Sequence, residues 1–165
     1  MRQIVLILHN LRSTHNVGSL LRTAEGLGVT KLFLTGYSPY PLRADGDNRL
    51  PHIAKKLDSQ IHKTALDAES LVGWEHQDDI FEVLDRLRAN GFTIVAVEQT
   101  TTSIALPDFV PADKLVLIVG REVEGIEPEV LEAVDVAVEI PMFGKKESFN
   151  VVQAAAMALY HCRFR

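Results

Sequence analysis

Residues 135–163 constrain the fold more than any other stretch of this 165-residue chain. A strand-like apolar run leads into Ile140 and Pro141, a polar loop with one glycine follows, and a helix then begins near Ser148–Asn150. This order places backbone amides beside a helix N-terminus, where an anionic group can bind. Up to Tyr160 the helix carries almost only valine, alanine, methionine and leucine. A helix that is apolar all round must be buried all round, so we expect cover from other segments or from a second subunit. A plain core helix in a monomer is the simpler alternative.

The rest of the chain alternates between strand and helix patterns. This alternation predicts one α/β domain over residues 1–165, with a mostly parallel sheet flanked by helices. The predicted strands are 3–9, 31–35, 70–74, 92–97, 115–119 and 136–140. The predicted helices are 17–27 with Asn16 as its cap, 51–57, a helix from Asp78 to Asn90, a short one from Pro128 and the C-terminal one.

Composition excludes several classes of protein. No apolar run approaches the roughly 18 residues that a membrane helix needs, and the N-terminal run is too short for a signal peptide. Cys162 is the only cysteine, so no internal disulfide can form, and the six histidines show no metal-binding spacing. We therefore expect a cytoplasmic protein without a metal.

Charge is distributed unevenly along the chain. The net charge is −5, yet residues 78–139 hold 14 Asp and Glu against four Lys and Arg, so both ends of the chain are net positive. If the two ends meet in space, they form a positive face that suits nucleic acid. A solvated acidic surface without a partner explains the same composition.

Three familiar nucleotide or nucleophile motifs are absent. The turn GREVEGIEP is not a phosphate-binding Walker loop, because Gly125 is followed by Ile126 instead of Lys. No GxGxxG follows a strand, so a dinucleotide-dependent oxidoreductase lacks its fingerprint. GKKESFN is not the GxSxG of a hydrolase, and Ser148 reads as a helix N-cap.

Three separated motifs resemble the SpoU-type (TrmH-like) branch of the SPOUT RNA methyltransferases, in the family's order. They are NLRSTHNVGSLLRTAEGLGV, LIVGREVEGI and IPMFGKKESFNVVQAAAMALY. The segment KTALDAESLVGWE also resembles one seen in some members, and the set spans essentially the whole chain. The chain departs from many members at Val152-Gln153, where they have a small hydroxyl residue.

The resemblance implies an α/β fold with a C-terminal deep trefoil knot, one of the rare exceptions to unknotted folding. It also implies S-adenosylmethionine as cofactor, bound in the knot largely through backbone groups. By position, the cofactor-binding residues would be Val97, Glu98, Gly120, Ile140, Met142 and Phe149.

The implied reaction is methyl transfer to a ribose 2′-hydroxyl of RNA, in a homodimer whose active sites are completed across the interface. The implied catalytic residues are Arg22, Asn16, Glu122, Ser148 and Asn150. At about 100° per residue, Arg22 falls opposite the apolar stripe of its helix and points away from its own core. Arginine stays charged at accessible pH, so we expect Arg22 to place a phosphate and stabilise the developing alkoxide. A plain surface arginine is the simpler interpretation.

We expect a single methyltransferase domain with no added RNA-binding domain, so RNA contacts are expected from cations in the catalytic domain itself. The candidates are Arg12, Arg43, Arg49, Lys55, Lys56, Lys145 and Lys146. A solvated face is an equally good explanation for the basic stretch near residue 55. We favour tRNA over rRNA as substrate; a catalytically inactive RNA-binding or assembly protein is the alternative function.

Overall fold

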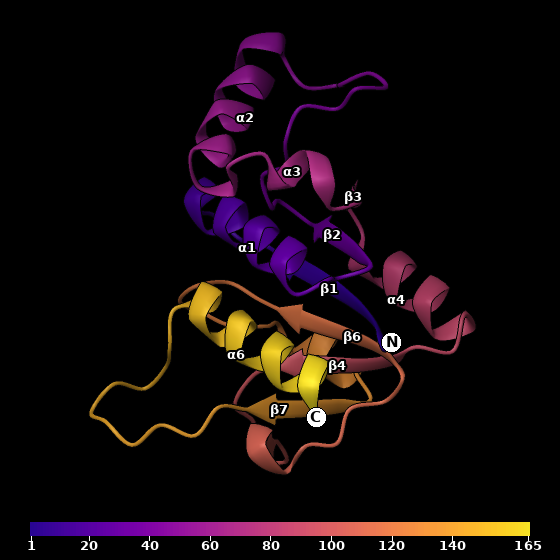
Figure 1. Cartoon of the computed structure of the whole chain (residues 1–165), viewed down its shortest axis with the longest axis vertical. Coiled ribbons are helices and arrows are strands. Elements are labelled where there is room, and N and C mark those ends of the chain that lie inside the picture. The colour runs from indigo at the N-terminus through magenta and orange to yellow at the C-terminus, as the bar shows by residue number, and fades with distance from the viewer.

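A seven-stranded sheet forms the centre of the computed structural model, which describes residues 1–165 (Figure 1). The strand order is β3-β2-β1-β6-β4-β7-β5, and every strand pairing is parallel. The strands are β1 (Gln3–His9), β2 (Lys31–Thr35), β3 (Trp74–Gln77), β4 (Thr93–Val97), β5 (Ile104–Ala105), β6 (Lys114–Val119) and β7 (Val136–Glu139). The predicted α/β class with a parallel sheet is therefore confirmed.

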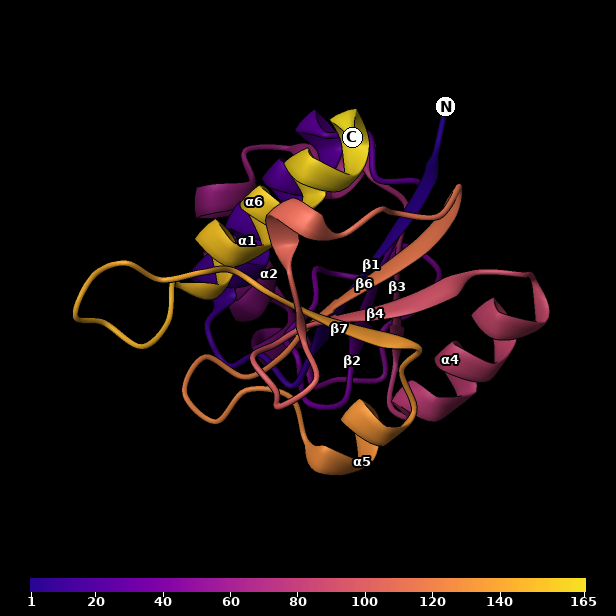
Figure 2. The same ribbon diagram turned by 90° about the horizontal axis from the view of Figure 1, so that it is seen from below.

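Helices cover both faces of the sheet. The helices are α1 (Thr14–Gly26), α2 (Pro51–Ala65), α3 (Ala68–Leu71), α4 (Ile80–Ala89), α5 (Pro128–Glu132) and α6 (Val151–Phe164). Figure 2 shows α1, α2 and α6 on one side of the sheet and α4 and α5 on the other. No helix in the molecule has both the length and the apolar character needed to cross a membrane.

Each face of the sheet has its own core because successive side chains of a strand point to opposite faces. In β1, Leu6 and Leu8 join the buried cluster under α1, α2 and α6. Val5 and Ile7 join the smaller cluster under α4 and α5. Strands buried on both faces read as continuous apolar runs, which is why the central strands could be predicted from the sequence.

The packing of α1 on α2 depends on Gly18. A Cβ atom at this position would lie 2.2 Å from the carbonyl oxygen of Ile61 and 2.2 Å from the hydroxyl of Thr64. Only glycine allows the two helix backbones to approach so closely. The glycine of the first motif is thus explained by helix packing.

Four local predictions are wrong. Ser13, and not Asn16, caps α1, and its side chain accepts a hydrogen bond from the Asn16 amide. The helix predicted over 51–57 continues to Ala65, because Ile61 and Ala65 give its second half a buried face. Residues 68–71 are helical, and the strand predicted at 70–74 instead starts at Trp74. The expected loop 99–113 contains β5 and a short 3-10 helix at Leu106–Asp108.

The C-terminal helix is buried on one side only. Asn150 caps α6 by accepting a hydrogen bond from the Val152 amide, so the N-cap prediction for Ser148 is wrong. Ala155, Ala158, Leu159 and Cys162 are fully buried against the sheet and α1. The opposite side, which includes Tyr160, is not covered by this chain.

Candidate active site

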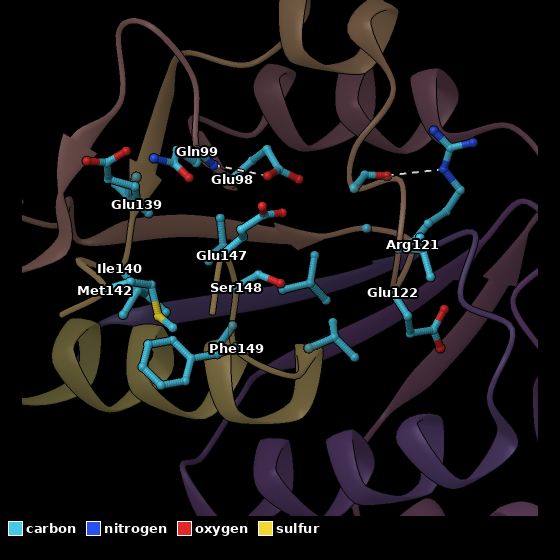
Figure 3. Close-up of a pocket in the computed structure, with 18 residues that line it drawn as sticks. Glu98, Gln99, Arg121, Glu122, Glu139, Ile140, Met142, Glu147, Ser148 and Phe149 are labelled. Atoms are coloured by element: carbon cyan, nitrogen blue, oxygen red, sulfur yellow. Dashed lines mark hydrogen bonds between the residues drawn. The ribbon is translucent and has the colours of Figure 1, made fainter. Parts of the chain in front are cut away.

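A pocket lies at the carboxyl ends of β4, β6 and β7 (Figure 3). These three strands are neighbours in the sheet, so segments far apart in the sequence meet at one edge. All six residues predicted to bind the cofactor line this pocket, as do Glu122 and Ser148 from the predicted catalytic set. The complete lining is Val97, Glu98, Gln99, Val119, Gly120, Arg121, Glu122, Val123, Gly125, Val138, Glu139, Ile140, Met142, Glu147, Ser148, Phe149, Val151 and Ala154.

Glu98 stabilises the turn that forms one wall of the pocket. Its carboxylate accepts hydrogen bonds from the amide of Ile126 at 3.0 Å and from the amide of Gln99 at 3.0 Å. Gly125 has a positive φ of 72°, and a Cβ there would lie 2.3 Å from the Glu98 carboxylate. A Cβ at Gly120 would lie 2.6 Å from the side chain of Ile126. Both glycines of the turn 120–125 are therefore required by its close packing.

Glu122 joins this turn to the loop that starts α1. Its carboxylate accepts hydrogen bonds from the amides of Arg12 and Ser13 at 3.3 and 3.1 Å, and from the side-chain amide of Asn16 at 3.1 Å. In Figure 3, Arg121 and Glu122 leave the turn in opposite directions. Burial alone raises the pKa of Glu122, but hydrogen bonds from Ser13, Asn16 and Arg12 outweigh it, and its pKa lies below the ordinary value.

A network of hydrogen bonds and ion pairs around His9 and Glu127 was not predicted from the sequence. Nε2 of the buried His9 lies 3.3 Å from Glu127, and its Nδ1 lies 2.8 Å from the hydroxyl of Thr35. Glu127 also accepts a hydrogen bond from the Asn10 side chain at 2.7 Å and lies 3.5 Å from Nε of Arg121. Burial lowers the pKa of His9, although the nearby Glu127 partly opposes this. These groups connect the end of β1 to the start of α5.

The loop from Pro141 to Asn150 forms the outer wall of the pocket. It extends away from the body of the molecule in Figure 1. Met142, Ser148 and Phe149 line the pocket, whereas Phe143 is fully exposed at 100%. Asn150 lies at the end of this loop, and its side chain is used as the helix cap.

The predicted catalytic residues do not all meet in one chain. Asn16 is linked to the pocket turn only through Glu122. Arg22 is exposed on α1, as its helical position predicted, and forms no hydrogen bond or ion pair. Arg22 is also absent from the lining of the pocket.

The sequence model of the SpoU rRNA Methylase family matches residues 48–160. The chain belongs to the SpoU rRNA methylase family. The resemblance predicted from the three motifs is therefore confirmed.

Two curated relatives show the breadth of this methylase family. The chain is 27% identical over 162 residues to a tRNA (guanosine(18)-2′-O)-methyltransferase of Aquifex aeolicus, covering 98% of this chain and 69% of that protein. It is 28% identical over 160 residues to the 23S rRNA (guanosine-2′-O-)-methyltransferase RlmB of Neisseria meningitidis, covering 97% of this chain and 58% of that one. The chain thus spans about two thirds or less of these relatives.

A solved methylase structure supports the fold. The SpoU methyltransferase AviRb from Streptomyces viridochromogenes, crystallised with the cofactor AdoMet, superposes with a TM-score of 0.81 at 21% identity. The match covers 99% of this chain and 58% of that one. At this level of identity the likeness establishes the shared fold.

The predicted RNA-binding cations of this SpoU-family chain differ in whether their side chains are already hydrogen-bonded within the protein. Arg49 is held inside the loop 36–50, where it donates to Asp47 and to the carbonyls of Tyr40 and Pro41 and lies 3.6 Å from the Tyr40 ring centroid. Its guanidinium therefore stabilises the loop. Arg43 donates to the carbonyl of His76 at 3.3 Å.

The remaining candidates are more accessible. Arg12 is exposed and lies 3.4 Å from Glu124. Lys55, Lys56, Lys145 and Lys146 are exposed without an ion pair.

Several polar residues of the pocket were missed. Glu139 and Glu147 line it, and Glu139 accepts a hydrogen bond from the Ser103 hydroxyl at 2.8 Å. Their position at the end of a predicted strand and in the motif loop was the available signal. One His, Asp and Glu cluster (His62, Asp67, Glu69) lies between α2 and α3, outside the pocket lining. The expectation of a metal-free site stays a prediction.

Proposed function

We propose that this chain is an S-adenosylmethionine-dependent RNA methyltransferase that methylates a ribose 2′-hydroxyl. The observation that carries the proposal is the pocket, because the three family motifs and the end of β4 converge on it or on the turn beside it. Family membership and curated relatives that are 2′-O-methyltransferases support the same reaction. The proposed compartment is the cytoplasm.

The pocket residues fit S-adenosylmethionine. Val97, Ile140, Met142 and Phe149 offer apolar and aromatic surface for an adenine ring. Carboxylates line the pocket beside only one arginine, which suits the positive charge of a sulfonium and an α-amino group. They are those of Glu98, Glu122, Glu139 and Glu147. When bound, the cofactor supplies an electrophilic methyl group.

Arg22 provides the positive charge for the RNA side of the reaction. Its guanidinium binds a phosphate of the substrate and stabilises the oxygen as the 2′-hydroxyl loses its proton. Asn16 and Glu122 hold the start of α1. Ser148 of the pocket lining orients the ribose together with the side-chain NH2 of Asn150, whose Oδ1 caps α6. Alignment of the hydroxyl with the methyl donor contributes much of the rate.

We infer a homodimer in which Arg22 serves the partner's pocket. Two observations support it. Arg22 does not line the pocket of its own chain. In addition, Tyr160 and Phe164 of α6 are 61% and 68% exposed with ring centroids 4.7 Å apart, and with Met157 they line an open groove. Exposed apolar surface of this kind marks an interface.

The proposed fold includes the C-terminal knot of the family. β7 lies between β4 and β5, yet α6, which follows β7, packs against α1 and near β6 and β4. This return of the chain across the pocket edge is compatible with a threaded segment.

The substrate is proposed to be a structured RNA, with tRNA tested first. The chain covers 69% of the Aquifex tRNA enzyme and 58% of the Neisseria rRNA enzyme. Proposed phosphate contacts come from the exposed cations Arg12, Lys55, Lys56, Lys145 and Lys146.

The direct test is methyl transfer from labelled S-adenosylmethionine to purified tRNA and rRNA, followed by nucleoside mass spectrometry. We expect a 2′-O-methylated nucleoside. Arg22→Ala should nearly abolish transfer while calorimetry shows unchanged cofactor binding, and Lys114→Ala, an exposed cation at the amino end of β6, is the control. Full activity of Arg22→Ala removes Arg22 from the mechanism. A wild-type protein that binds RNA but neither binds nor uses the cofactor is the inactive alternative.

A further inference from the structure

The exposed face of α2 carries a straight basic stripe, which we call the α2 ridge. His52, Lys56, Ser59 and Lys63 follow one another at intervals of four, three and four residues, so they share one side of the helix. Lys55 lies beside this row and is included in the α2 ridge. From His52 to Lys63 the ridge is about 16 Å long, at 1.5 Å per residue.

The lysines of the ridge are free, unlike most cations of this chain. Arg2, Arg121 and Arg163 illustrate the general pattern, because each donates to a backbone carbonyl of the fold. The lysines and arginines that form neither an ion pair nor a hydrogen bond are Arg22, Lys55, Lys56, Lys63, Lys145, Lys146 and Arg165. The α2 ridge thus gathers three of the free cations on one rigid element.

Acidic side chains near the ridge are directed elsewhere. Asp58 lies on another side of α2 and accepts a hydrogen bond from the Leu42 amide at 2.8 Å. Glu69 binds His62 at 2.5 Å beyond the end of the row. A solvated helix face in a chain of net charge −5 is ordinarily interspersed with acids. The ridge instead keeps one sign of charge.

Hydrogen bonds and close packing fix α2, which carries the ridge, to the first turn of α1. Thr64 donates to the carbonyl of His15 at 2.9 Å, and Thr14 donates to Gln60 at 3.3 Å. Gly18 lets the two helices touch. Glu122 of the pocket turn binds Ser13 and Asn16 at the same end of α1, so the ridge has a defined position relative to the candidate active site.

We propose that the α2 ridge binds the phosphate backbone of the substrate RNA beside the nucleotide that is methylated. This inference rests on the proposed function and adds His52 and Lys63 to the two lysines expected from the sequence. A row of ammonium groups binds phosphates as point charges, and such contacts position a nucleic acid without reading its bases. Specificity for the nucleotide therefore resides elsewhere in the site.

The test compares two double variants with the same change of charge. Lys56→Ala/Lys63→Ala removes two cations from the ridge. Lys31→Ala/Lys114→Ala removes the half-exposed Lys31 and the exposed Lys114 at the amino ends of β2 and β6, away from the pocket edge. Filter binding of unfractionated bacterial tRNA is measured from 50 to 200 mM salt, and calorimetry measures S-adenosylmethionine binding.

We expect the ridge variant to bind tRNA about tenfold more weakly at 100 mM salt, with the control within twofold. The slope of log K against log salt should fall by about 1.4 to 1.8, because each lost phosphate contact removes about 0.7 to 0.9. Cofactor binding should be unchanged in both variants, since neither pair lines the pocket.

Each other outcome has a definite meaning. Equal losses in the two variants, or an unchanged slope, overturn the ridge and leave the proposed function standing. A wild-type protein that binds tRNA through the ridge but transfers no methyl group from the cofactor to any RNA contradicts the proposed function alone. If the wild-type protein binds no RNA, RNA binding by the ridge is refuted. The methyl-transfer assay then tests the proposed function independently.

Discussion

Replacing Glu122 with alanine would disconnect the pocket turn from the loop that starts α1. The carboxylate accepts three hydrogen bonds, from the amides of Arg12 and Ser13 and from the side chain of Asn16. Alanine leaves these three donors without their acceptor. Glu124, two residues along the same turn, makes only one 3.4 Å contact with the exposed Arg12 side chain. Glu124→Ala is therefore a matched control.

The cost of losing Glu122 follows from how exposed each donor is. The hydrogen bond from the Arg12 amide is exposed, so water can replace its acceptor at little cost. The bonds from Ser13 and Asn16 are partly buried, and a hydrogen bond to a charged group contributes about 1.5–3 kcal/mol when it is well shielded. Allowing for partial solvent access, we expect Glu122→Ala to lower the free energy of unfolding by about 2 kcal/mol. At this chain length that corresponds to a fall of about 4–8 °C in Tm. Glu124→Ala should cost about 0–0.5 kcal/mol.

Urea unfolding of the wild type and both variants at several pH values measures these differences. The pKa of Glu122 is lower in the folded protein than its ordinary value, so its contribution is complete above the unfolded pKa of about 4.3. The contribution is lost as pH falls through the folded pKa. The gap between wild type and Glu122→Ala should thus be constant near neutral pH and close below about pH 4.

Equal stability of the two variants at pH 7 would refute the role of Glu122 as a link between turn and helix. A gap that persisted unchanged into the acid range would show that the lost contact does not depend on the carboxylate charge. Hydrogen exchange at the Ser13 amide gives a local check, because this amide should exchange faster in Glu122→Ala alone.

Three further predictions concern the glycines and the buried histidine. Gly18→Ala should lower the Tm markedly, despite the higher helix propensity of alanine, because its Cβ would lie 2.2 Å from a backbone carbonyl of α2. Gly125→Ala should weaken S-adenosylmethionine binding at least tenfold by calorimetry, through its positive φ and its clash with Glu98, whereas Gly144→Ala, with nothing within 4 Å, should not. Burial lowers the pKa of His9, so the imidazole takes up a proton more readily in the unfolded chain than in the folded one. Stability should therefore fall as pH drops below about 6.5 toward the folded pKa. In thermal melts, His9→Gln should lessen that fall.

The central strands were readable from the sequence because burial on both faces leaves a plain apolar run. β1 and β6 show this well. β3 could not be read in the same way, since its sequence WEHQ lies at an edge of the sheet and is only half-buried. The preceding Ser70–Val72 has the better strand composition, but the backbone is helical to Leu71. Local propensity was overridden there by packing.

The pocket residues were predictable through the family motifs, while the contacts that hold them were not. Glu98 and Ile126 are 28 residues apart, and Asn10 and Glu127 are 117 apart. No local pattern announces such pairs, because they form only when the sheet brings strand ends together. The role of Arg49 in its own loop was likewise not predictable, because its hydrogen bonds to Asp47 and to the Tyr40 carbonyl depend on how the loop folds.

The turn 120–125 contacts the pocket on one face and the start of α1 on the other. On one face Glu98 holds the turn in place as a wall of the pocket. On the other, Glu122 binds the first residues of α1, the helix that carries Arg22. A ligand that presses on the pocket wall therefore acts on a segment directly bonded to the start of that helix. If Arg22 serves the partner's pocket, the hydrogen bonds of Glu122 connect the pocket of one subunit to the Arg22 side chain that the same subunit contributes to the pocket of its partner.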